Sequence, residues 1–245
     1  MALQNYFSDM RRIAYDQTPG DGPGVFFLGG FNSNKEGTKA LALEDWAKAQ
    51  GRAYLRFDYS GHGASAGDVT DFTLGDWIED AAAIFGGMTE GPQVFVGSSM
   101  GAWIALVLGA RMPERVAGLV TVAAAPDFTE RHYLSSFTEA QRAELEQSGQ
   151  IAIPSEYDET PYIITKKLID EARNHLVLTK PIHLPFPTRF LMGTDDAAVS
   201  METTMRLLDC AEGPDVSLTL VKDADHRFSD ARCLSLIKQS IESIS

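Results

Sequence analysis

The sequence predicts an α/β fold with a mostly parallel central sheet and helices on both faces. Short apolar runs of strand length alternate along the chain with longer segments of helical periodicity, a pattern typical of parallel strands joined by crossover helices. The chain has 245 residues, of which 44% are hydrophobic and 21 are glycine. This length and composition suit one sizeable domain with many tight connections, or a domain that carries an insertion.

The first half of the chain supplies most of the predicted sheet. Apolar runs such as VFFLGG and QVFVGS predict strands at residues 25–30, 53–59, 93–98 and 116–125. Helical periodicity predicts the helices between them, at residues 36–51, 74–88 and 100–113. Asp76 is well placed near the first turn of the second helix, where a negative charge meets the positive end of the helix dipole.

The second half returns to the same alternation after a long interruption. TRFLMG and VSLTLV predict strands at residues 188–193 and 216–221, and helices are expected around residues 201–211 and 230–244. Residues 127–187 contain no convincing strand of the sheet. They hold two helical patterns, TEAQRAELEQSG and YIITKKLIDEARNHL, with the turn-rich IAIPSEYDETP between them.

A segment of this size is too long for an ordinary loop. We therefore expect an α/β core formed by residues 1–126 and 188–245, with a helical cap insertion at residues 127–187. The cap should cover the carboxyl edge of the sheet, where such sheets bind ligands.

Charge and composition exclude several classes of function. The formal net charge of −13 argues against binding to nucleic acid or to an anionic membrane surface. Cys210 and Cys233 match no metal-ligand spacing and suit a reducing compartment. The first 16 residues resemble neither a signal peptide nor a spanning helix, and their acidic residues count against a transit sequence. We expect a cytoplasmic protein without stable membrane insertion.

The pattern Gly-x-Ser-x-Gly occurs twice, as GASAG around Ser65 and as GSSMG around Ser99. The nucleophilic version requires a strand before the serine and a helix after it, because the serine sits at a sharp turn between the two. Ser99 has this context. Ser65 lies well after a strand and is followed by DVTDFT, which has no helical pattern. Ser99 is therefore the predicted nucleophile and GASAG is read as a flexible turn.

A serine nucleophile needs a base, normally a histidine held by a carboxylate. His226 follows the last strand and completes the order serine, acid, histidine. His62 is the next candidate, whereas His132, His175 and His183 fall in the insertion and are expected to be structural or exposed. Chain order leaves two acids nearly equal, Asp195 and Asp196, and Asp127 is a third candidate.

At this point the chain resembles the α/β-hydrolase superfamily, through FLGGF, RFDYSGHGAS, VGSSMGAW, MGTDDAAV and ADHRF in that order. Within it, GTKALALE, TLGDW and GPQVFVGSSMGAW resemble the mitochondrial abhydrolase-domain group of depalmitoylating thioesterases and acyl-glucuronide esterases. The pattern His-Gly-x-x-Asp-x-x-Val around the acid of the superfamily implies Asp196, with Val199 three places beyond, although Met192 replaces the histidine. The resemblance also implies an oxyanion hole formed by the amides of Met100 and Phe31, with Gly30 as an alternative.

These observations predict a serine hydrolase that cleaves carboxylic ester or thioester bonds through an acyl-enzyme, with no cofactor and no metal. Its substrate would be a small molecule or an acylated protein. Alternatives are a C–C bond hydrolase, acyltransferase or perhydrolase on the same fold, or a non-catalytic binding protein. Aromatic and aliphatic residues of the insertion are candidates to line an acyl pocket, namely Tyr133, Leu134, Phe137, Tyr162 and Ile163. Basic residues that would accommodate an anionic substrate are Arg131, Lys166, Lys167 and Arg227.

Overall fold

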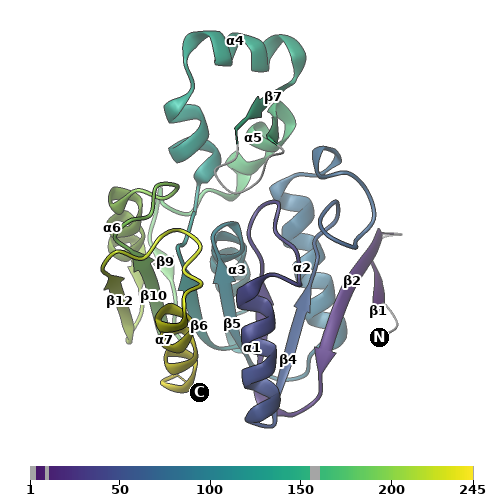
Figure 1. Ribbon diagram of the computed structural model, residues 1–245, viewed down its shortest axis with the longest axis vertical. Helices are drawn as coiled ribbons and strands as arrows, with labels where there is room; N and C mark the ends of the chain where they lie inside the picture. The colour runs from purple at the N-terminus through teal and green to yellow at the C-terminus, as the bar shows by residue number, and fades with distance from the viewer. Residues whose placement is uncertain (1–3, 9–10, 155–160, 245) are drawn as a thin grey trace.

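The computed structural model describes residues 4–8, 11–154 and 161–244. Its centre is an eight-stranded sheet in the order β1-β2-β4-β3-β5-β6-β10-β12 (Figure 1). The six strands from β4 to β12 in this order are parallel to one another, as predicted, and each lies close to its expected position. They are β3 (Asp21–Leu28), β4 (Arg52–Phe57), β5 (Gln93–Ser98), β6 (Val116–Val122), β10 (Thr188–Gly193) and β12 (Val216–Val221).

Two further strands, which the sequence did not predict, extend one edge of the sheet. They are β1 (Gln4–Ser8) and β2 (Arg11–Thr18), and β2 runs antiparallel to both β1 and β4. Charged and polar residues stand at both ends of β2 and leave only three apolar residues between them, so β2 lacks the longer apolar run that identifies a strand buried on both faces.

Helices cover both faces of the sheet. α1 (Thr38–Ala49) and α7 (Ala231–Glu242) contact each other on one face, while α2 (Leu74–Met88) and α3 (Met100–Arg111) pack together on the other (Figure 1). α6 (Met201–Cys210) packs beside β12. Asp76, which was expected near the first turn of this helix, forms a capping box with Thr73 at the start of α2.

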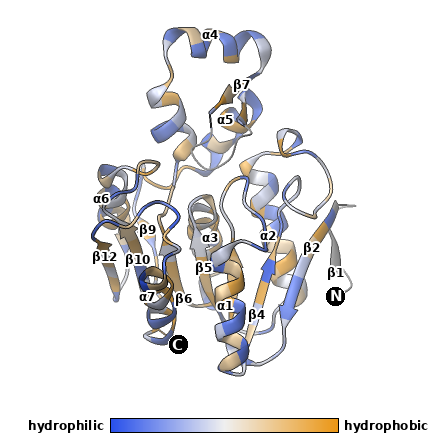
Figure 2. Cartoon of the chain, in the orientation of Figure 1, coloured by the Kyte–Doolittle hydropathy of each residue, from blue (hydrophilic) through white to orange (hydrophobic). Residues whose placement is uncertain are grey.

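The hydrophobic core lies between the sheet and these helices. All six residues of β5 are buried, and the central strands are predominantly hydrophobic (Figure 2). α3 is apolar around most of its circumference because it packs against the centre of the sheet, where nine of its twelve residues are buried.

The segment at residues 127–187 projects beyond the carboxyl edge of the sheet (Figure 1). It contains a π-helix (Thr129–Leu134), α4 (Glu139–Ser148), the antiparallel pair β7 (Gln150–Ile153) and β8 (Tyr162–Thr165), and α5 (Lys166–Ala172). β9 (Ile182–His183) near its end pairs with β11 (Ala211–Glu212) outside the central sheet.

The first predicted helix of this segment is correct, and α4 ends at Gly149 in the left-handed conformation. The second predicted helix starts too early in the sequence, because Tyr162–Thr165 form β8 and the helix begins only at Lys166. Its partner strand β7 lies in the piece expected to be a turn, of which residues 155–160 fall outside the described residues. Both strands are four residues long, too short for periodicity to separate them from neighbouring helix or turn.

The register of the parallel strands brings the site together. Leu28 pairs with Gly97, Ser98 with Val122, and Gly193 with Val221. The strands β3, β5, β10 and β12 therefore end at one edge, and the segments that follow them converge there.

Candidate active site

Ser99 occupies a sharp turn between β5 and α3. Its backbone has φ of 54° and ψ of −118°, a sparsely populated conformation for a residue with a side chain. The turn is held on both sides, because the Ser99 amide donates to the carbonyl of Val122 and the Ser99 carbonyl accepts from Ala102 and Ala125. The predicted strand–serine–helix context is therefore present at Ser99.

The two glycines of GSSMG permit this turn by their lack of a side chain. A Cβ at Gly97 would lie 2.6 Å from the Cα of Ala102, and a Cβ at Gly101 would overlap the carbonyl oxygen of Leu28. α3 consequently approaches both β5 and β3 at distances that only glycine allows.

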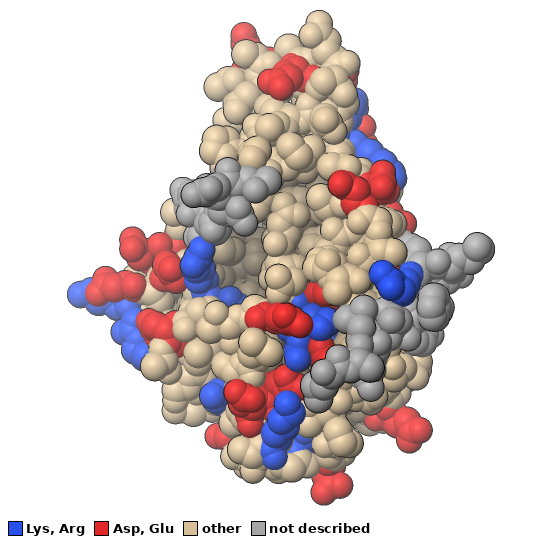
Figure 3. All heavy atoms as spheres, turned by 45° about the vertical axis from the view of Figure 1, so that its right-hand side comes forward, with Lys and Arg blue, Asp and Glu red and all other residues tan. Residues whose placement is uncertain are grey.

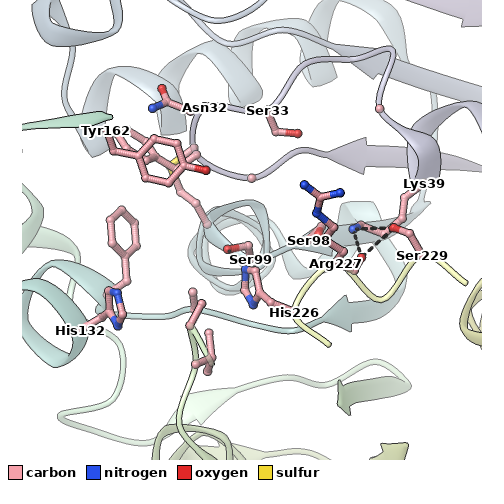
Figure 4. A pocket seen from close by; sticks show the side chains of 18 of the residues that line it. Asn32, Ser33, Lys39, Ser98, Ser99, His132, Tyr162, His226, Arg227 and Ser229 are labelled. Carbon is pink, nitrogen blue, oxygen red and sulfur yellow. Dashed lines mark hydrogen bonds between the residues drawn. The ribbon is translucent and has the colours of Figure 1, made fainter. Parts of the chain in front are cut away.

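His226 lies between Ser99 and Asp196. Its Nε2 is 3.1 Å from the Ser99 hydroxyl, and its Nδ1 is 2.8 Å from Oδ2 of Asp196 (Figure 4 shows the Ser99–His226 pair). A carboxylate only accepts hydrogen bonds, so Nδ1 carries a proton and Nε2 of the neutral ring is left to accept from the serine hydroxyl.

Asp196 is fixed independently of the histidine. Its side chain is 0% exposed, and its Oδ1 accepts from the amides of Ala198 and Val199 at 2.9 and 2.8 Å. These bonds orient the carboxylate so that Oδ2 faces the imidazole. The structure thus brings Ser99, His226 and Asp196 together as the sequence predicted.

The residues predicted for the oxyanion hole lie beside the serine. Met100 is the first residue of α3, where helix amides have no partner within the helix. Phe31 follows β3, and the neighbouring Gly30 is so close that a Cβ there would lie 3.3 Å from the Cβ of Ser99. Phe31 and Met100 line the same cavity as Ser99.

That cavity has a volume of about 640 Å³ and has two chemically distinct sides. One side is apolar and aromatic and is formed largely by the segment 127–187, with Phe31, Phe128, Tyr133, Ile153 and Tyr162. The Phe31 ring lies 6.0 Å from that of Phe128 and 5.8 Å from that of Tyr162. Lys39, Arg227 and Ser229 gather on the other side and make it polar, whereas Asn32 lies toward Tyr162 (Figure 4).

Ser65, in the second Gly-x-Ser-x-Gly sequence, has a structural role in its turn. Its hydroxyl donates to the carbonyl of Asp58 at 2.6 Å and accepts from the amide of Ala14 at 2.9 Å. The serine thereby ties the turn to β2. GASAG is a turn, as predicted, and its serine is not part of the cavity.

His62 does not form a hydrogen bond with Ser99, because its Nδ1 faces the carbonyl of Ser60 and its Nε2 has no partner among the described residues. Its ring is buried against Tyr59, Trp77 and Phe31, and burial lowers its pKa to about 4. His175 pairs with Glu171 at 2.7 Å and His183 is exposed. His132, expected to be structural or exposed, is exposed and also lines the cavity (Figure 4).

The two other candidate acids serve different purposes. Asp127 is buried, and its two oxygens accept from the amides of Val177 and Leu178, so it joins the start of the segment 127–187 to the residues that follow α5. Burial raises the pKa of this carboxyl. The amide of Asp195 donates to the carbonyl of Ala224, while the residue itself is exposed.

The cavity is lined by some of the residues that were candidates for a substrate pocket. Of the five candidate residues, Tyr133 and Tyr162 line the cavity. Leu134, Phe137 and Ile163 do not line it. Ile163 follows Tyr162 in β8, and successive side chains of a strand point to opposite faces. The ring of Phe137 stacks against that of Tyr133. Of the four basic candidates only Arg227 lines it. Lys39 was missed, because its position in the first turn of α1 carries no sequence signal.

Comparisons with known proteins identify relatives over almost the whole chain. A family model described as serine aminopeptidase, S33, matches residues 24–174. The mitochondrial palmitoyl-protein thioesterase ABHD10 of Mus musculus is 36% identical over 97% of this chain and 80% of its own length. The corresponding protein of Homo sapiens is 36% identical over 96% of this chain and 77% of its own length.

Solved structures extend this similarity to the fold. Mouse alpha/beta hydrolase domain-containing protein 10 superposes with a TM-score of 0.91 at 33% identity, covering 99% of this chain and 98% of the other. A provisionally assigned hydrolase from Agrobacterium vitis S4 gives a TM-score of 0.93 at 34% identity, covering 100% and 99%.

The relatives contradict one expectation. The cytoplasmic location predicted above is wrong by this comparison, because the matching ABHD10 proteins are mitochondrial. Among the described residues no helix is both long and apolar enough to cross a bilayer.

On the face shown in Figure 3, acidic and basic side chains are interspersed rather than separated by sign.

Proposed function

The chain is a hydrolase of the α/β-hydrolase family, and from this membership we propose that it cleaves carboxylic ester or thioester bonds with Ser99 as nucleophile. The observation that carries the proposal is the unbroken series of contacts from Ser99 through His226 to Asp196, with separations of 3.1 and 2.8 Å. A serine hydroxyl is a poor nucleophile without such a base, and an imidazole is best oriented by a buried carboxylate.

The proposed reaction has two steps. Ser99 attacks the substrate carbonyl while Nε2 of His226 accepts the hydroxyl proton, and Asp196 stabilises the imidazolium that forms. His226 then donates this proton to the leaving alcohol or thiol, which departs and leaves an acyl group on Ser99. Water activated by the same imidazole hydrolyses the acyl-enzyme and restores the serine.

The amides of Met100 and Phe31 are proposed to stabilise the oxyanion. Both residues line the cavity around Ser99, and the start of α3 adds the positive end of its dipole. Two backbone donors directed at a developing oxyanion typically lower the barrier by about 3 kcal/mol or more.

The two sides of the cavity suggest an orientation for the substrate. We assign the acyl chain to the aromatic side and the leaving group to the polar side, with residues 127–187 acting as a cap over the acyl chain. A long acyl chain fits the apolar side, in keeping with the palmitoyl-protein thioesterase relatives. Arg227 on the other side would favour a leaving group that carries a carboxylate, as in an acyl glucuronide.

A substrate panel tests this function. Purified protein is assayed with p-nitrophenyl esters of increasing acyl length, a palmitoyl thioester and an acyl glucuronide, beside the Ser99→Ala variant. We expect turnover by the parent alone, with kcat/KM rising with acyl length. Binding of these compounds without turnover would instead support a binding protein, and cleavage of a diketone in preference to the esters would support a C–C bond hydrolase.

A further inference from the structure

The segment that carries His226 is joined to the core on both sides of the histidine, in addition to the bond between His226 and Asp196. On the side before the histidine, the amide of Asp223 donates to Oγ1 of Thr194, and the carbonyl of Ala224 accepts from the amide of Asp195. These bonds join the histidine segment to the acid segment. On the side after it, the Phe228 side chain is 0% exposed in the core, with a backbone φ of 49°.

His226 itself lies between these attachments, and Lys39 reaches the backbone next to it. Lys39 is the second residue of α1, 188 positions away in the sequence. Its Nζ donates to the main-chain carbonyl of Arg227, and lies 3.5 Å from the hydroxyl of Ser229 (Figure 4). The Ser229 hydroxyl donates to the same carbonyl at 2.8 Å. One ammonium therefore engages the residues directly after the proposed base.

We propose that Lys39 is a positioning residue, whose hydrogen bonds to Arg227 and Ser229 hold the His226 imidazole within reach of Ser99. The inference rests on the proposed function, since it concerns the alignment of the proposed base. Lys39 acts through the backbone of the histidine segment and not on the reacting atoms. A hydrogen bond from an ammonium is roughly twice as strong as one between neutral groups, so its charge contributes to the attachment.

The environment of Lys39 makes this attachment sensitive to pH. Burial lowers the pKa of its amine to about 8. The titratable groups that act on it are the Asp225 carboxyl and the Cys233 thiol, which raise the pKa, and Arg227, which lowers it further. The pKa of the Cys233 thiol is itself raised to about 11 by burial, so this thiol is neutral near pH 8. Below this pKa the amine is an ammonium and the charge-assisted bonds are intact. As the pH rises through about 8 the charge is lost and the bonds weaken.

The test compares Lys39→Met and Lys39→Arg with the parent on p-nitrophenyl acetate, a neutral substrate that needs no charge recognition. Methionine keeps the apolar stem but cannot donate, and we expect kcat to fall about ten- to a hundredfold with KM nearly unchanged, as for a misplaced catalytic group. Arginine keeps the charge and should retain most of kcat. Lys48→Met is the matched control on the same helix, since Lys48 is exposed and pairs with Glu44.

The pH profile separates positioning from a general structural role. After correction for spontaneous hydrolysis, kcat of the parent should decline above pH 8, whereas Lys39→Arg should stay level because its guanidinium keeps its proton. This comparison decides the matter even if Lys39→Met fails to fold.

Coincident profiles for the parent and Lys39→Arg, or a Lys39→Met variant with the kcat of the parent, would overturn the inference while leaving the proposed function intact. A parent that neither turns over esters nor reacts with a fluorophosphonate would refute the proposed function, and this inference with it.

Discussion

The Nε2 atom of His226 lies 3.1 Å from the hydroxyl oxygen of Ser99, although 127 positions separate the two residues in the chain. The proximity arises because two different strands end at the same edge of the sheet. Ser99 is raised above the sheet by the turn between β5 and α3, and His226 is delivered by the segment after β12. The register of the sheet therefore places the serine hydroxyl and the imidazole within hydrogen-bond distance of each other.

Replacement of the buried acid should disable the base. Asp196→Asn keeps the shape of the side chain but loses the charge that orients and stabilises the imidazolium, so kcat should fall on the order of 10³- to 10⁴-fold. Steady-state kinetics on a p-nitrophenyl ester measure this loss. The neighbouring Asp195→Asn is the matched control, because Asp195 is exposed and contributes its backbone rather than its carboxylate. Equal losses in the two variants would mean that the acid is misassigned.

The serine of the GASAG turn should matter for stability and not for turnover. Ser65→Ala removes the hydroxyl that bridges Asp58 and Ala14, and should lower the free energy of unfolding by about 1–2 kcal/mol. Urea denaturation measures this cost. The kcat of the folded variant should equal that of the parent. A large loss of kcat at unchanged stability would contradict the structural role of this residue.

A bulky side chain on the aromatic side of the cavity should discriminate between acyl chains. Ile153→Trp would fill space proposed for the chain, lowering kcat/KM for long acyl esters about tenfold while sparing acetate. The control is Ile163→Trp, on the partner strand β8 and outside the cavity. If the acetate ester lost as much kcat/KM as the long esters, or if Ile163→Trp had the same selectivity, the assigned orientation of the substrate would be incorrect.

The parallel part of the fold was predictable because its strands are buried on both faces and therefore appear as continuous apolar runs. β2 escaped prediction since it lies near the edge and its sequence, RRIAYDQT, has only three consecutive apolar residues between charged and polar ones. The β7–β8 pair was missed for a different reason. Its strands are four residues long, and YIIT runs directly into the helix that starts at Lys166.

The candidate site was predictable to the extent that chain order implies position. Ser99 and His226 follow strands, and parallel strands place the segments after them at one edge. The choice between Asp195 and Asp196 depended on a family pattern, because the two neighbours differ only in which carboxylate is buried. Lys39 could not be found from sequence, since its contact with Arg227 depends on how α1 packs against a segment 188 positions away.

The central claim, that Ser99 is the nucleophile, is tested most directly by locating a covalent adduct. The protein is reacted with a fluorophosphonate and digested with trypsin, and the modified residue is identified from fragment ions. Fragmentation is essential because cleavage after Arg56 and Arg111 leaves Ser65, Ser98 and Ser99 on one peptide. We predict a single phosphonyl group on Ser99, absent from the Ser99→Ala variant. An adduct on Ser65, or undiminished labelling of Ser99→Ala, would contradict the account.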